Sequence, residues 1–197
     1  YEDKQKNIWL GSVSTGCVKI SFSGEKATAQ TFKAGSGQNS ISSNAVNDIF
    51  QDSHFNNWVL TSKGICLIKN NQVIKLRQDK NNNISYIKAY ELNKKIYFVS
   101  INGDIMVYNL GTEKFERFVA LKFSNKVVQT STFQIATLGA TKILVSIQRK
   151  GLYIYNTLTN QYSTSESILG EQIGSDVYLK SDKYGNVWAF NFTGNTW

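Results

Sequence analysis

Five segments of the sequence share one pattern: an apolar strand, usually around an aromatic residue, then a short polar turn, a glycine and a second apolar strand. The glycines are Gly16, Gly64, Gly103, Gly151 and Gly194, and successive spacings are 48, 39, 48 and 43 residues. A period of about 40–45 residues is typical of four-stranded propeller blades and is too long for ankyrin or leucine-rich repeats. The spacing therefore predicts an all-β chain made of repeated antiparallel sheets.

Each unit is expected to contain four strands, here named A to D. Strand A ends at an aspartate, Asp52 or Asp182, whose carboxylate can accept backbone N–H groups in the A–B turn. Strand B carries an aromatic residue that fills the space between neighbouring sheets, and the glycine allows a tight B–C hairpin. We interpret all three as structural residues of the repeat, and the aromatic residues are Trp9, Trp58, Tyr97 and Trp188.

Counting strands along the repeat gives about 17. Strand B is represented at both ends of the chain, whereas a closed ring would leave no strand over. We therefore expect residues 1–197 to form one segment of about four blades, part of a larger propeller. The expected blade parts are 1–35, 36–79, 80–124, 125–170 and 171–197. The range 42–51 also shows apolar residues at helical spacing, but the repeat assigns it to strand A.

Composition leaves little for metal or nucleophile chemistry, since the chain has one histidine and two cysteines. The spacing of Cys17, His54 and Cys66 does not suit a zinc site. We expect neither a metal nor another cofactor. We expect two buried free thiols, with a disulfide as the alternative. The apolar runs are too short to predict a membrane span.

The charge balance is basic, with 22 Lys and Arg against 14 Asp and Glu and a net charge of +8. Such a balance favours anionic partners. The lysines are scattered, however, and no zinc-finger or RNA-recognition pattern occurs, so nucleic acid is not an expected partner.

The residues of three units resemble a known repeat. The segment 43–65, which reads Ser-Asn-Ala-Val-Asn-Asp-Ile-Phe-Gln-Asp-Ser-His-Phe-Asn-Asn-Trp-Val-Leu-Thr-Ser-Lys-Gly-Ile, is similar to the two-component regulator propeller repeat. The segments 7–12 and 183–188 match other parts of that repeat. The match is weak around Tyr97 and Leu144, where Glu91 and Leu138 replace the aspartate.

The resemblance implies a setting and a ligand class. Such repeats are typical of the periplasmic sensor region of Bacteroidetes hybrid two-component system histidine kinases. The family implies two propellers, an immunoglobulin-like domain, a membrane span and cytoplasmic kinase parts. It also implies that an oligosaccharide binds and alters a dimer, and so kinase activity. The partners expected from it are an oligosaccharide, the rest of the propeller and kinase chain, and a second copy in a homodimer.

Loops at the ends of propeller strands are the expected place for a ligand. Amide and guanidinium groups in the B–C hairpins could bind sugar hydroxyls, and adjacent cations could meet a sulfate or a uronate carboxylate. The alternative is that these are ordinary solvated turn residues. The candidates are Lys63, Asn102, Gln148, Arg149 and Lys150.

The sequence leaves two other function classes open. A propeller lyase or glycosidase would need paired carboxylates or a metal-binding histidine. The acidic residues here mostly occupy turn positions of the repeat, so no catalytic residue is predicted. A protein-interaction scaffold resembling WD-repeat proteins would normally show Gly-His and Trp-Asp dipeptides, which this sequence lacks.

Overall fold

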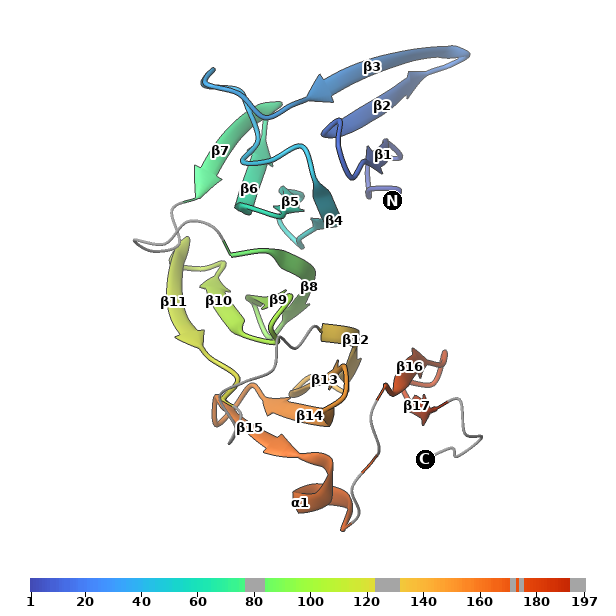
Figure 1. Ribbon diagram of the computed structural model, residues 1–197. Coiled ribbons are helices and arrows are strands. Elements are labelled where there is room, and N and C mark those ends of the chain that lie inside the picture. The colour runs from blue at the N-terminus through green and yellow to red at the C-terminus, as the bar shows by residue number, and fades with distance from the viewer. Residues whose placement is uncertain (77–83, 123–131, 171–172, 174–175, 192–197) are drawn as a thin grey trace. The chain divides into compact units, whose positions relative to one another are not determined.

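The structure is a computed structural model and describes residues 1–76, 84–122, 132–170, 173 and 176–191. Within these ranges the chain forms 17 strands and one helix of five residues (Figure 1). Wherever the register of two paired strands is determined, the two strands are antiparallel. The predicted all-β class is confirmed.

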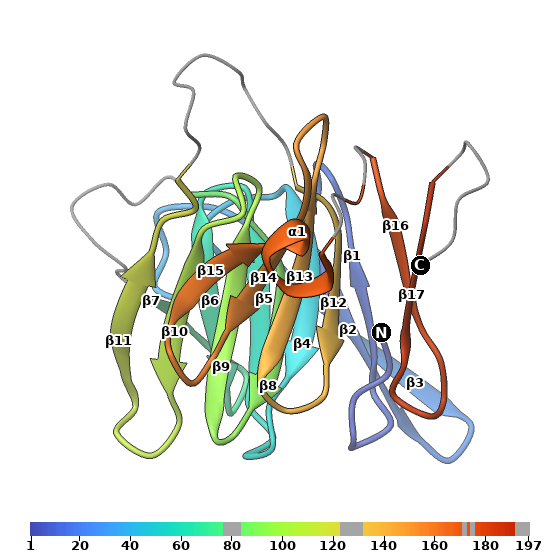
Figure 2. The same ribbon diagram turned by 90° about the horizontal axis from the view of Figure 1, so that it is seen from below.

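The strands group into sheets in the order of the chain, as Figures 1 and 2 show. The first sheet has three strands: β1 (Ile8–Gly11), β2 (Cys17–Ser23) and β3 (Lys26–Phe32). The second has four: β4 (Val46–Gln51), β5 (Asn57–Thr61), β6 (Gly64–Lys69) and β7 (Gln72–Leu76). The third has four: β8 (Tyr86–Leu92), β9 (Lys95–Ser100), β10 (Ile105–Asn109) and β11 (Lys114–Val119).

The remaining elements follow the same order. The fourth sheet contains β12 (Thr132–Leu138), β13 (Lys142–Ile147), β14 (Gly151–Asn156) and β15 (Gln161–Thr164). The helix α1 (Ser165–Leu169) comes next, followed by a two-stranded sheet of β16 (Tyr178–Ser181) and β17 (Val187–Phe190). The range 42–51, whose apolar residues have helical spacing, contains strand β4, as the repeat predicted. Its buried residues are Val46, Ile49 and Gln51, and the bulge between Val46 and Asp48 explains why the first two are three positions apart.

The chain divides into two compact units, residues 1–91 and 92–197. In the first unit, a core lies between the sheets β1–β3 and β4–β7 and is filled by side chains from both. Both cysteines belong to this core as buried free thiols, so the predicted thiols are confirmed and the disulfide is not formed. Burial raises the pKa of Cys17 to about 12, which keeps this thiol protonated. The core residues are Trp9, Cys17, Phe32, Ile41, Val46, Ile49, Val59, Cys66, Ile68 and Val73.

The second unit has two cores. One contains Tyr97, Val99, Ile105, Val107, Leu121, Ile143, Val145, Ile147 and Tyr155. In the other, side chains of β13 and β14 pack with Ile173, Val177 and Ala189. Helix α1, which the repeat did not predict, is a single turn. The side chain of Thr164 accepts a hydrogen bond from the Ser167 N–H at its start, and Gly170 ends it at a φ of 76°.

Four hairpin glycines have positive φ, as the sequence predicts for tight B–C turns: 89° at Gly16, 114° at Gly64, 84° at Gly103 and 93° at Gly151. At Gly16 a Cβ atom would lie 2.1 Å from the carbonyl oxygen of Phe32, so space as well as φ requires glycine. The predicted Gly194 lies outside the described residues.

Candidate functional site

One turn recurs three times with the pattern Asp-x-x-x-Asn-x-Trp. It lies directly before strand B. In each copy one aspartate oxygen accepts two backbone N–H groups, while the other accepts the asparagine amide and the tryptophan indole N–H. In the copy at Asp52 the indole Nε1 of Trp58 lies 2.8 Å from Oδ2. The copies are Asp3-Asn7-Trp9, Asp52-Asn56-Trp58 and Asp182-Asn186-Trp188.

The surroundings of the three tryptophans differ. Trp9 and Trp58 are 1% and 0% exposed, whereas Trp188 is 55% exposed. The expectation that the strand-B aromatic fills the space between sheets therefore does not hold for Trp188. Its strand, β17, belongs to a sheet of two described strands and pairs there with β16.

A different turn is found where the aspartate is missing. Between β8 and β9 the connection is the dipeptide Asn93-Lys94, and both residues have positive φ, 51° and 61°. Two consecutive residues of positive φ form the tight hairpin turn that suits the twist of antiparallel strands. Tyr97, the aromatic residue of this unit, is buried and packs edge-on against Tyr155 at 6.1 Å.

The residues predicted to bind ligand all lie in B–C hairpins. Gln148 and Arg149 are exposed in the β13–β14 turn with Lys150 partly exposed, and Asn102 is exposed in the β9–β10 turn of the same unit. The Arg149 N–H donates to Asp176 Oδ1 at 3.2 Å, which attaches the turn to the segment before β16. Lys63 is exposed in the β5–β6 turn of the first unit. Their role in binding stays a prediction.

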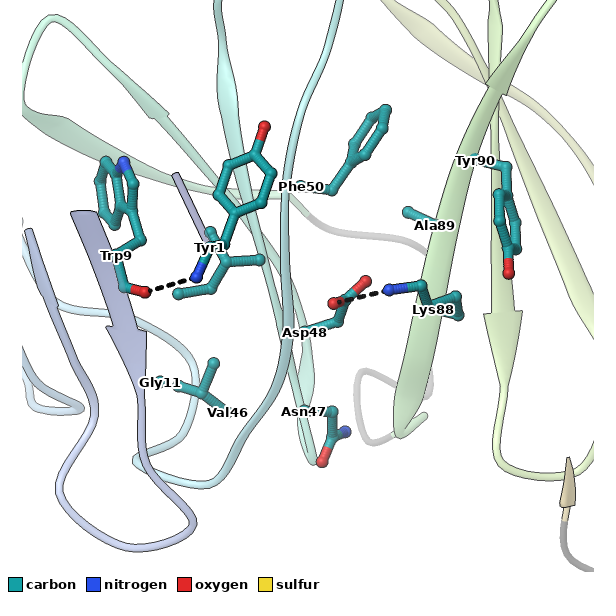
Figure 3. A pocket seen from close by; sticks show the side chains of 11 residues that line it. Tyr1, Trp9, Gly11, Val46, Asn47, Asp48, Phe50, Lys88, Ala89 and Tyr90 are labelled. Atoms are coloured by element: carbon teal, nitrogen blue, oxygen red, sulfur yellow. Dashed lines mark hydrogen bonds and ion pairs between the residues drawn. The ribbon is translucent and has the colours of Figure 1, made fainter. Parts of the chain in front are cut away.

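The structure shows a pocket in the first unit that lies away from those hairpins. Its volume is about 550 Å³, within the range of about 300–1,000 Å³ typical of ligand pockets. Figure 3 shows strands β1, β4 and β8 contributing its side chains. The lining residues are Tyr1, Trp9, Gly11, Val46, Asn47, Asp48, Ile49, Phe50, Lys88, Ala89 and Tyr90.

Two strands of equal position in the repeat build the polar and aromatic wall of the pocket. Strands β4 and β8 are the A strands of consecutive sheets, and their residues correspond at an offset of 40 positions. Asp48 thus corresponds to Lys88, and Phe50 to Tyr90. The Lys88 ammonium donates to Asp48 Oδ1 at 3.0 Å, so the offset places opposite charges side by side (Figure 3).

Burial dominates the electrostatics of this ion pair. The Asp48 side chain is 17% exposed and that of Lys88 is 44% exposed. Burial raises the pKa of the Asp48 carboxyl, although the neighbouring Lys88 ammonium acts in the opposite direction. Burial, together with the Asp48 charge, raises the pKa of Tyr90 to about 12, so this phenol is a hydrogen-bonding group without charge at neutral pH.

The chemistry available in the pocket is binding through rings, hydroxyls and one ion pair. Tyr1, Phe50 and Tyr90 supply aromatic surface, and Asp48 and Lys88 supply an acceptor and a donor. In the described ranges, no group of three or more His, Cys, Asp or Glu side chains is placed to hold a metal ion. None of the helices described there is long and apolar enough to cross a membrane.

Sequence reasoning missed the pocket because its residues lie in the A strands and not in the hairpins. A signal was present nonetheless, since aligning the units at the A strands places Asp48 opposite Lys88 and Phe50 opposite Tyr90. The same reasoning missed Asp3 as the aspartate of the first unit. Its spacing to Asn7 and Trp9 repeats that of Asp52 to Asn56 and Trp58.

Comparison with solved structures finds similar architectures in extracellular domains of hybrid two-component systems and in a lyase. The extracellular domain of the hybrid two-component system BT4673 from B. thetaiotaomicron aligns over 96% of this chain with a TM-score of 0.71 and 19% identity. That of the hybrid two-component system BT3049 from the same organism aligns over 100% with a TM-score of 0.69 and 18% identity. Virginiamycin B lyase from Staphylococcus aureus aligns over 100% with a TM-score of 0.65 and 14% identity.

These similarities establish the fold. The WD40 β-propeller domain of Doa1 also aligns, over 88% of this chain with a TM-score of 0.54 and 13% identity, so the predicted β-propeller class is confirmed. The resemblance to hybrid two-component systems agrees with the extracellular domains of such systems that share this fold. The chain spans only 27% and 28% of the two extracellular domains and 67% of the lyase. No protein-family model matches the sequence. No curated protein matches it either.

Proposed function

We propose that this propeller segment binds an oligosaccharide and forms part of the extracytoplasmic sensor region of a hybrid two-component system. The observation that carries the proposal is the pocket formed by Tyr1, β1, β4 and β8, which combines aromatic rings with a partly buried ion pair. The similarity of the fold to extracellular domains of such systems supports the setting.

The pocket has the features that sugar recognition needs. A pyranose ring presents a C–H patch, which packs on aromatic faces such as that of Phe50. Its hydroxyls both donate and accept hydrogen bonds, and the Asp48–Lys88 pair offers an acceptor beside a donor. The volume of about 550 Å³ accommodates a small saccharide unit within the usual range of ligand sites.

The wider context follows from the family that the repeats resemble. In this proposal the domain lies in the periplasm as part of an inner-membrane protein with a histidine kinase, and ligand binding alters a homodimer and so the kinase. A ligand acts on such an equilibrium only through a difference in its affinity for the two states. The remainder of the propeller and the kinase chain are its expected intramolecular partners.

Binding is favoured over catalysis by the composition of the pocket. Glycoside hydrolysis commonly uses two carboxyl groups on either side of the scissile bond. Among the described residues that line this pocket, Asp48 is the one carboxylic acid, and its neighbour Lys88 holds it in an ion pair. An assay for hydrolysis or elimination on glycans separates a sensor from a propeller lyase or glycosidase, and a pull-down tests the scaffold alternative.

A thermal-shift and calorimetry screen tests the proposal. The probes are neutral tetrasaccharides of glucose, galactose, mannose and xylose, together with tetragalacturonate and a sulfated chondroitin tetrasaccharide. A ligand at about 100 times its Kd stabilises the native state by about 2.7 kcal/mol, which raises the melting temperature by several degrees. We expect at least one probe to produce this rise.

A pair of variants links binding to the pocket. Phe50→Ala removes an aromatic ring from the pocket wall, and we expect it to weaken binding of the active probe at least fivefold. Phe22→Ala removes a ring that is 58% exposed in β2 of the same unit, and it should leave affinity unchanged. The proposed function is contradicted if no probe binds.

A further inference from the structure

The ion pair in the pocket bears on which sugars it accepts. We infer that the pocket selects an uncharged, hydroxyl-rich sugar unit and that Asp48 orients it. This inference rests on the proposed function and goes beyond it by naming the ligand class and the residue that sets it. Three features of the described residues carry it: the charge balance, the unfilled capacity of the carboxylate, and the shape of strand β4.

The charges within the pocket cancel locally. Among the lining side chains, Asp48 carries the carboxylate and Lys88 the ammonium, and they are 3.0 Å apart. The α-ammonium of Tyr1 donates to the Trp9 carbonyl oxygen at 3.1 Å. An anionic sugar that approached Lys88 would lie beside Asp48, and a cationic one that approached Asp48 would lie beside Lys88. Because like charges at short range repel strongly in a partly buried site, both classes are disfavoured relative to a neutral sugar.

The carboxylate has an oxygen that lacks a hydrogen bond. Lys88 Nζ contacts Oδ1, whereas Oδ2 is buried and has no partner. The N–H groups of Ile49 and Ala89 lie near enough to lower the pKa of Asp48, but neither makes a hydrogen bond of normal geometry to Oδ2. A buried acceptor without a donor costs about 1–3 kcal/mol, so a hydroxyl donor is favourable there. Because Oδ2 is covered in this structure, the Asp48 side chain must turn toward the pocket to meet that donor.

A hydroxyl is the group that satisfies both members of the pair at once. It donates its proton to a carboxylate oxygen and accepts a hydrogen bond from an ammonium. The Lys88 side chain is 44% exposed, so its remaining N–H groups are open to such a contact. A ligand carboxylate or sulfate can only accept and an ammonium can only donate, so each would leave one partner unsatisfied.

A bulge in β4 occurs where Asp48 enters the wall. Val46 pairs with Thr61 and Asp48 pairs with Leu60, so Asn47 is an additional residue on this strand. Bulges change the local twist and redirect side chains. Strand β12 has an irregularity at the corresponding place, between Thr132 and Gln134. The bulge therefore recurs in two A strands of the repeat. In β4 the residue after the bulge is the acidic Asp48, whereas in β12 it is Gln134.

The test compares neutral and anionic probes on matched variants. Calorimetry measures the affinity of the neutral tetrasaccharide that binds best and of tetragalacturonate for wild type, Asp48→Asn and Glu25→Gln. Asp48→Asn preserves size but removes the charge in the pocket. Glu25→Gln removes a carboxylate from the exposed β2–β3 turn of the same unit and is the control. Circular dichroism and thermal unfolding verify that each variant folds.

We expect the neutral probe to bind wild type at least tenfold more tightly than tetragalacturonate. Asp48→Asn should weaken neutral binding about tenfold, while Glu25→Gln changes it less than twofold. If Asp48→Asn does not fold, carboxyl ¹³C NMR of the wild-type protein decides, because the Asp48 resonance must shift when the neutral probe binds.

The outcomes separate this inference from the proposed function. Equal or tighter binding of tetragalacturonate overturns the inference and leaves oligosaccharide binding intact. Neutral binding that is unaffected by Asp48→Asn, or an unchanged Asp48 resonance, removes Asp48 from the site. Failure of every probe to bind overturns both.

Discussion

The buried Asp52–Trp58 turn should be far more important for stability than its exposed copy at Asp182. Asp52 is fully buried, and its carboxylate accepts hydrogen bonds from the N–H groups of His54 and Asn56, the Asn56 amide and the Trp58 indole, all at 2.8–2.9 Å. Asp52→Ala removes all of these at once. Because Trp58 is 0% exposed, water cannot replace the lost partner of its indole N–H.

The magnitude follows from these contacts. A buried donor without a partner costs about 1–3 kcal/mol, which applies to the Trp58 indole. Each of the other bonds, which lie nearer the surface, contributes about 0.5–1 kcal/mol after water compensates in part. The total loss in the free energy of unfolding is about 3–5 kcal/mol. With an m-value of about 2–3 kcal/mol/M for urea, the midpoint falls by about 1–2 M.

Urea unfolding followed by tryptophan fluorescence and far-UV circular dichroism measures the shift, with Asp182→Ala as the matched control. That variant removes an equivalent set of hydrogen bonds, but Trp188 is exposed and water can take the place of the carboxylate. We expect its effect to be clearly smaller. An equal fall in the midpoint for both variants would refute the argument from burial.

Three further predictions concern stability, pH and ligand charge. Gly16→Ala should lower the free energy of unfolding by more than Gly24→Ala, for which we expect a loss of roughly 1 kcal/mol. The reason is that a Cβ at Gly16 meets the Phe32 carbonyl oxygen, whereas a Cβ at Gly24 has open space around it. Urea unfolding of both variants measures the difference. Burial alone would raise the pKa of Asp3, but hydrogen bonds outweigh it and lower the pKa. The carboxylate therefore stabilises the fold above about pH 4, and this contribution is lost as pH falls through the folded-state pKa. In Asp3→Asn the free energy of unfolding should fall less steeply with decreasing pH than in wild type, and an unchanged slope would contradict this. Arg149→Ala should weaken any anionic oligosaccharide bound at the β13–β14 turn by about 1 kcal/mol or more, and unchanged affinity in calorimetry removes Arg149 from that site.

Sequence reasoning succeeded where structure is local. The glycines, the strand order and the buried thiols follow from patterns that span one hairpin or one repeat. Gly103 shows why: its φ of 84° is set by the β9–β10 turn alone, so a single segment is enough to predict it. The turn at Asn93-Lys94 is local too, but the repeat pattern does not specify a turn in this unit, where Glu91 replaces the aspartate.

Features that depend on neighbouring sheets were harder to predict. Asp48 and Lys88 are 40 residues apart, and their contact joins the A strands of two consecutive sheets, with a bulge in β4 next to Asp48. Trp188 has the same local sequence pattern as Trp58, yet its exposure differs because burial depends on which strands cover it. A repeat pattern states what each unit can form, whereas the residues of a site are set by differences between units.

The turn shared by Asp3, Asp52 and Asp182 has a kinetic consequence. Its indole and carboxylate are six positions apart, so the closure entropy of the loop is small and the contact can form before any distant segment arrives. Chains rich in such short-range contacts fold faster than those that depend on remote pairing. Folding can therefore nucleate at several places along this chain, with the remaining strands adding to hairpins that are already closed.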